Sequence, residues 1–139
     1  MTAFDTDILT DIAKRVPQVM ARVASVSPNE RFLPIVVAEE ALRGQLASVR
    51  LAQAGSGRVT LERAYASVEE TLRASKDIQL LPYTTLADAL FVAWRIAKLK
   101  VGIQDLRIAA VCVAHGAKLV TRNERDFALV PGLNLEVWN

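Results

Sequence analysis

Short apolar runs alternate along the chain with longer segments in which apolar residues recur every three or four positions. The short runs are typical of buried strands, and the longer spacing is typical of amphipathic helices. The expected strands are residues 2–5, 32–35, 78–81, 117–120 and 133–137. The expected helices are residues 6–15, one from Pro17, 36–52, one from Thr60, 85–99 and 105–115. This alternation predicts an α/β sandwich with a mainly parallel sheet.

The segment 105–115 is apolar almost all round, so we expect this helix in the centre of the fold. It contains Cys112, the only cysteine of the chain, which we expect to be a buried and inert thiol. A single cysteine excludes an intramolecular disulfide and favours a reducing compartment. His115, the only histidine, gives with Cys112 just two transition-metal ligands, and two ligands do not make a site.

Length and composition set broad limits on the function. The 139 residues are 52% hydrophobic and 23% charged, which fits one folded domain over residues 1–139. The formal net charge of +2 permits a polyanionic partner but does not establish one. No apolar run approaches the roughly 18 residues of a membrane span, and no secretion signal is evident. We therefore expect a cytoplasmic protein with no membrane partner.

Four carboxylates lie beside segments that look like core, where an unpaired charge is costly. They are Asp5, Glu40, Asp105 and Asp126. Their convergence on a shared cation is the most economical explanation, because hard divalent cations take several oxygen ligands from different segments. The pattern therefore indicates a metal-dependent phosphoryl-transfer enzyme.

The expected sheet brings two of these positions together. Asp5 follows the first strand and the loop 121–126 follows the strand ending near Val120. Ligands of open parallel sheets bind at the carboxyl ends of the strands, so both should open onto the same edge.

Each acid also has a structural alternative. Asp5 and Asp105 could cap helices. Either Glu39 or Glu40 could be the functional residue, or both could be solvated.

Five stretches in order carry a resemblance to a known family. They are Asp-Thr-Asp-Ile-Leu at 5–9, Ala-Glu-Glu-Ala-Leu-Arg-Gly at 38–44, residues 101–110, residues 119–127, and Val-Pro-Gly-Leu at 130–133 with Glu-Val-Trp at 136–138. With these motifs over nearly its whole length, the chain resembles the PIN-domain ribonucleases, specifically the VapC toxins of toxin–antitoxin pairs. The resemblance implies a PIN-like three-layer α/β/α sandwich and an endoribonuclease activity.

The resemblance also implies a set of site residues. Asp5, Glu40 and Asp105 match family acids that hold Mg²⁺ or Mn²⁺, and the glycine four residues later selects Glu40 over Glu39. The fourth position is either Asn123 or Asp126, and we favour Asp126 because it carries a charge.

Two further residues are expected to support these ligands. Thr121 matches a supporting hydroxyl of the family. Asp7 replaces the asparagine of the usual Asp-Thr-Asn motif, so we interpret it as a neighbour of the ligands rather than a ligand.

The partners implied by the resemblance are an RNA substrate, a cognate VapB-like antitoxin and a second copy of the chain in a homodimer. Four arginines are candidates for contacting RNA phosphates: Arg43, Arg107, Arg122 and Arg125.

Two alternatives remain open at this point. Phe4-Asp5-Thr6-Asp7 mimics the Asp-x-Asp nucleophile motif of haloacid-dehalogenase-type phosphatases, although the further lysine and Gly-Asp motif of that class are not evident. The other alternative is a catalytically dead PIN-like module that only binds RNA or protein.

Overall fold

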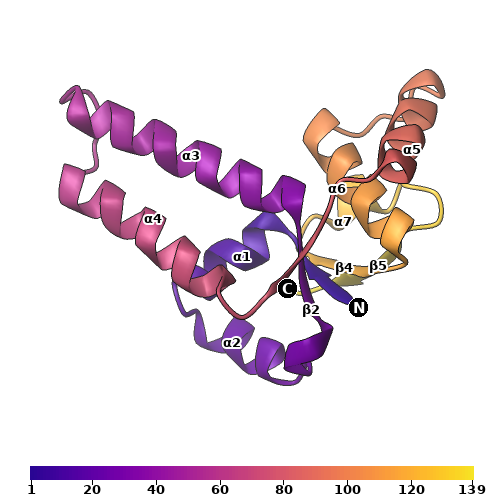
Figure 1. Ribbon diagram of the computed structural model, residues 1–139, viewed down its shortest axis with the longest axis horizontal. Coiled ribbons are helices and arrows are strands. Elements are labelled where there is room, and N and C mark those ends of the chain that lie inside the picture. The colour runs from indigo at the N-terminus through magenta and orange to yellow at the C-terminus, as the bar shows by residue number, and fades with distance from the viewer.

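The computed structural model describes residues 1–139 and contains five strands and seven α-helices (Figure 1). The strands are β1 (Thr2–Phe4), β2 (Arg31–Pro34), β3 (Gln79–Leu81), β4 (Lys118–Thr121) and β5 (Asn134–Val137). The helices are α1 (Thr6–Ala13), α2 (Pro17–Ala24), α3 (Ile35–Gln53), α4 (Leu61–Ser75), α5 (Thr85–Ile96), α6 (Ile103–His115) and α7 (Glu124–Phe127), with a 3₁₀ turn at Pro28–Glu30.

The strands form one parallel sheet in the order β3-β2-β1-β4-β5. The first three strands therefore extend the sheet in one direction from β1, and β4 and β5 extend it in the other. Right-handed crossovers in opposite directions place helices on opposite faces of the sheet. The predicted α/β/α sandwich is confirmed.

The two central strands show how the sheet divides the core. Ala3 pairs in register with Leu119, and Phe4 pairs with Val120. Successive side chains of a strand point to opposite faces. Ala3 and Leu119 accordingly belong to the cluster that contains α6, whereas Phe4 and Val120 pack with side chains of α1, α2 and Trp138.

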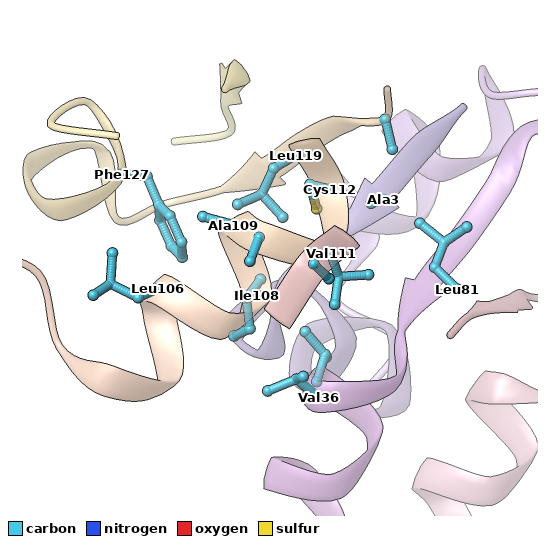
Figure 2. Packing of buried hydrophobic residues seen from close by; sticks show 14 of the residues in the cluster. Ala3, Val36, Leu81, Leu106, Ile108, Ala109, Val111, Cys112, Leu119 and Phe127 are labelled. Carbon is cyan, nitrogen blue, oxygen red and sulfur yellow. The ribbon is translucent and has the colours of Figure 1, made fainter. Parts of the chain in front are cut away.

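Helix α6 is the centre of the larger cluster (Figure 2). It contacts α3, α5, α7 and three strands, so nearly its whole circumference is covered. This explains why the helix is apolar all round. Cys112 is fully buried, and burial raises the pKa of its thiol to about 12, as expected for an inert side chain.

The ends of α6 differ in one respect from the sequence prediction. The helix begins at Ile103 rather than at Asp105, with Gly102 as its N-cap, so Asp105 lies inside the first turn. At the other end Gly116 has φ +67°, a left-handed conformation that glycine adopts without strain. His115 lies beside the carbonyl of Pro82 at 3.0 Å, in keeping with a structural role at the helix end.

The long helices α3 and α4 run side by side and project away from the sheet (Figure 1). Thr60 caps α4 by accepting a hydrogen bond from the Arg63 amide at 3.2 Å. Residues 54–60, which include Gly55 and Gly57, connect the two helices. None of the helices combines the length and apolarity that crossing a membrane requires.

The central position of α6 leads to a stability prediction. Ile108 is fully buried in the larger cluster, so Ile108→Ala should lower the free energy of unfolding by about 2–5 kcal/mol. Ile96 on α5 is 77% exposed, and Ile96→Ala should cost less than about 1 kcal/mol. Urea unfolding followed by circular dichroism measures both, and equal losses would contradict the assignment of α6 as the core helix.

Candidate functional site

The candidate site lies where the sheet changes direction, at the carboxyl ends of β1 and β4. These strands are neighbours in the sheet, and the chain continues from β1 to β2 on one side and from β4 to β5 on the other. In doubly wound sheets a crevice opens at this switch point because the two connections diverge. Asp5 directly follows β1 and Thr121 ends β4, so both reach this crevice.

Asp5 joins the two strand ends. Its Oδ2 accepts a hydrogen bond from the Thr121 hydroxyl at 2.6 Å, and its Oδ1 accepts one from the Thr6 amide at 2.7 Å. Asp5 is therefore the N-cap of α1 as well as a buried acid of the site, with 6% of its surface exposed. The supporting hydroxyl expected at Thr121 lies beside Asp5.

Asn123 connects the β4 loop to the acid on α6. Its Nδ2 donates to Oδ2 of Asp105 at 3.4 Å and to Oδ2 of Asp126 at 3.2 Å. Its backbone amide donates to the Thr121 hydroxyl oxygen at 3.0 Å. Both candidates for the fourth position thus lie next to Asp105, with the Asn123 amide between the two carboxylates.

The glutamates of α3 take different environments. Glu39 is exposed and forms an ion pair with Arg43 one turn later. Glu40 is half-buried, and its Oε2 is covered without any hydrogen-bond partner. The charge of Glu40 acts on Asp105, which places Glu40 rather than Glu39 beside the cluster.

Asp7 supports the same loop from α1. Its Oδ2 accepts a hydrogen bond from the Arg122 amide at 2.9 Å, while its Oδ1 is buried and has no partner. One turn further along α1, Asp11 pairs with the Arg122 guanidinium. Sequence reasoning missed Asp11, although its spacing of four residues from Asp7 puts both acids on one face of α1.

The pKa values of two acids record the crowding of negative charge. Burial raises the pKa of Asp5 to about 7; hydrogen bonds from Thr121 and Thr6 oppose this rise, and the charges of Asp7 and Asp105 add to it. The pKa of Asp105 is raised by burial and then by the charges of three other acids, Glu40, Asp126 and Asp7. No lysine or arginine contributes to either shift.

The five acids Asp5, Asp7, Glu40, Asp105 and Asp126 are called the acidic cluster below. It is an open arrangement, since no three His, Cys, Asp or Glu side chains stand close enough together to enclose an ion. Its donors nevertheless suit a hard divalent cation, because they are all oxygens and the covered Glu40 Oε2 and Asp7 Oδ1 have no partner in the protein. Mg²⁺ keeps several of its waters and so does not require a complete protein cage.

The four candidate phosphate contacts lie in different surroundings. Arg122 and Arg43 are paired with Asp11 and Glu39 respectively. Arg107 donates to the Gln104 side chain at 3.1 Å. Arg125 is exposed on α7 and forms no ion pair, so its guanidinium is the most available of the four.

The burial of Asp5 predicts a specific pH dependence of stability. Ionised Asp5 destabilises the fold, because its pKa is 3.8 in the unfolded chain and about 7 in the folded protein. This destabilisation is absent below pH 3.8, grows as pH rises toward 7 and is complete above it. At its full size it corresponds to about 4 kcal/mol. Asp5→Asn should therefore stabilise the metal-free protein increasingly between pH 4 and pH 8, less what the lost hydrogen bond contributes.

Chemical denaturation at several pH values in a chelator measures this difference, with exposed Glu62→Gln as the matched acid-to-amide control. A difference between Asp5→Asn and the wild type that does not change with pH would contradict the account.

Comparisons with known proteins agree with this architecture. Three solved structures illustrate the likeness. One is VapBC2 from Rickettsia felis, a complex bound to a DNA fragment from its own promoter. A chain of this complex has a TM-score of 0.77 at 19% sequence identity, and the match covers 99% of this chain and 98% of that one. A chain of VapBC-1 from nontypeable Haemophilus influenzae has a TM-score of 0.76 at 22% sequence identity, and the match covers 99% of this chain and 97% of that one. A chain of DNA-bound VapBC from Salmonella typhimurium has a TM-score of 0.74 at 21% sequence identity, and the match covers 99% of this chain and 98% of that one.

At these identities the structural likeness establishes the fold. A search of curated protein sequences gave no significant match. The family model described as PIN domain matches residues 3–133, most of the chain, and confirms the family expected from the motifs. The chain belongs to the PIN-domain family.

Proposed function

We propose that the protein is a cytoplasmic Mg²⁺- or Mn²⁺-dependent endoribonuclease, the toxin of a VapBC-type toxin–antitoxin pair. One observation carries the proposal. The fold gathers five acids at its switch point, and no basic side chain compensates those whose pKa is raised. Such an arrangement opposes folding unless a cation neutralises it, and a divalent cation is the cofactor that phosphodiester hydrolysis needs.

Asp5, Glu40 and Asp105 would hold the ion, with Asp126 or Asn123 as the fourth ligand. When bound, the ion supplies a water of lowered pKa and positive charge that offsets the negative charge developing on the phosphodiester. Side chains of the protein orient the proposed ligands. Thr121 fixes the orientation of Asp5, and Asn123 bridges Asp105 and Asp126.

Two further residues have proposed roles around the ligands. Asp7 holds the β4 loop through the Arg122 amide. Arg125, which has no ion pair, would contact a phosphate of the RNA strand.

The partners follow from the structural likeness. The similar chains include members of VapBC complexes, of which the Rickettsia felis complex is bound to a DNA fragment from its promoter and the Salmonella typhimurium complex is bound to DNA. We propose a VapB-like antitoxin as the binding partner of this chain and a homodimer as its own assembly. Exposed apolar residues along α3 and α5, among them Leu46 and Leu86, are available for such contacts.

The two alternatives are less well supported. In the Asp-x-Asp motif of the phosphatase alternative, the second acid must act in catalysis. Here Asp7 is engaged by the Arg122 amide, and the chain belongs to another family. A catalytically dead module would not need Asp5 and Asp105 to be held where burial and neighbouring negative charges raise their pKa values, because their ionised forms oppose folding.

The proposal predicts loss of cleavage when the proposed ligands are changed. Asp105→Asn and Glu40→Gln should lower the rate of RNA cleavage at least about a hundredfold, because each removes a charged oxygen ligand. Glu39→Gln, next to Glu40 but exposed and paired with Arg43, should cleave within a few-fold of wild type.

The assay is cleavage of a labelled RNA in Mg²⁺ or Mn²⁺ and in chelator. Cleavage that persists in chelator, or an Asp105→Asn variant as active as wild type, would refute the metal-dependent mechanism. Activity on p-nitrophenyl phosphate but not on RNA would favour the phosphatase.

A further inference from the structure

A recess of about 450 Å³ lies between α5 and the beginning of α6, the helix that carries Asp105. Six residues line it: Phe91, Val92, Arg95, Ile96, Ile103 and Arg107. Its volume falls within the range of small-ligand sites, and its mixture of apolar walls with a few polar groups is typical of such sites. We call it the Phe91 recess.

Two guanidinium groups face the ring of Phe91. The Cζ atom of Arg107 lies 4.8 Å from the ring centroid, and that of Arg95 lies 6.0 Å from it. Neither arginine forms an ion pair with a carboxylate. Asp88, the acid of α5, instead accepts a hydrogen bond from the Tyr83 hydroxyl at 2.9 Å. The recess therefore combines an aromatic ring with two positive, planar groups whose charge is not neutralised.

The apolar walls of the recess remain open to solvent. Val92 and Ile103 are each 46% exposed and Ile96 is 77% exposed. A bare phosphate would satisfy the arginines but would leave these walls in water. A second copy of the chain would cover the walls, but a two-fold contact would also bring four unpaired arginines together, which is unfavourable. A flat aromatic group attached to an anionic backbone would cover the apolar walls and would also pair with the two arginines.

The recess and the acidic cluster both involve the first turns of α6 but lie on different sides of this helix. Arg107 follows Asp105 by two residues, which is less than one helical turn but about 200° around α6. The recess therefore lies on the side of α6 away from the acidic cluster. Gln104 connects Arg107 with α3, because it accepts a hydrogen bond from Arg107 and donates one to Glu39 at 3.5 Å.

We propose that the Phe91 recess binds one unpaired nucleobase of the RNA strand on the side of α6 away from the acidic cluster, stacked on the guanidinium planes of Arg95 and Arg107 that the Phe91 ring supports. Proteins that recognise single-stranded RNA stack bases on aromatic rings and arginine planes, and this recess presents both. The inference rests on the proposed ribonuclease function for the identity of the strand. It adds a subsite for an unpaired base outside the acidic cluster.

Equilibrium binding without cleavage tests the proposal. Fluorescence anisotropy in a chelator would compare a short labelled oligouridylate with an abasic RNA strand of the same length. Phe91→Leu should weaken oligouridylate binding about tenfold and leave binding of the abasic strand unchanged. Arg95→Lys keeps the charge but loses the planar group, and it should show the same selective loss. Arg50→Lys, an exposed arginine on α3 outside the recess, is the matched control and should bind both strands like wild type.

Three results would overturn the proposal. The variants could bind oligouridylate like wild type, or they could lose affinity equally for both strands, which would mean backbone contacts only. Alternatively, light scattering could show a wild-type dimer that Ile96→Ser converts to a monomer, which would assign the recess to a second copy. Base-dependent binding by a protein that does not cleave RNA in Mg²⁺ or Mn²⁺ would support the recess and refute only the proposed function.

Discussion

The hydrogen bond from Thr121 to Asp5 joins the ends of the two central strands and thereby sets the geometry of the whole switch point. Asp5 must be buried to reach this bond, because it directly follows a strand whose last side chain, Phe4, is itself fully buried. From this point the α1 acids and the β4 loop are fixed to each other by the Arg122 amide and guanidinium. The fold thus holds Asp5 and Asp7 in place through uncharged hydroxyl and amide donors, and the one ion pair at this point, from Arg122, goes to Asp11.

The buried acids that form the proposed cation site lower the stability of the metal-free protein. Burial, with a smaller contribution from neighbouring negative charges, raises the pKa of Asp5, and the ionised form of such an acid opposes folding. The large apolar cluster around α6 offsets this cost, and the helix brings Asp105 to the site from its first turn. Strain of this kind is characteristic of functional sites, where local rules for stability are broken and compensated elsewhere. The same helix also carries Arg107, so α6 connects the acidic cluster with the proposed base-binding recess.

The sequence was sufficient to predict the order of elements and much of the candidate site. Alternating apolar runs predicted the sandwich, and the rule for parallel strands placed Asp5 and the 121–126 loop at one edge, where the structure has them. Periodicity left Glu39 and Glu40 as alternatives, because it does not determine the rotation of α3 to one residue, and only the family motif with Gly44 selected Glu40. Helix α7 has only four residues, too few to give a helical period. The Asp11–Arg122 pair and the Phe91 recess depend on how separate helices and loops pack, so no local pattern reports them.

The central claim is that the acidic cluster forms a cation site, and calorimetric titration with Mn²⁺ at pH 7 tests it most directly. The account predicts saturable binding to the wild type with release of protons, because Asp5 is partly protonated at this pH and must ionise to bind a metal. Repeating the titration in buffers of different ionisation enthalpy measures that release, and Asp105→Asn should abolish or strongly weaken the binding. Heats that are negligible for the wild type, or the same for wild type and Asp105→Asn, would contradict the account.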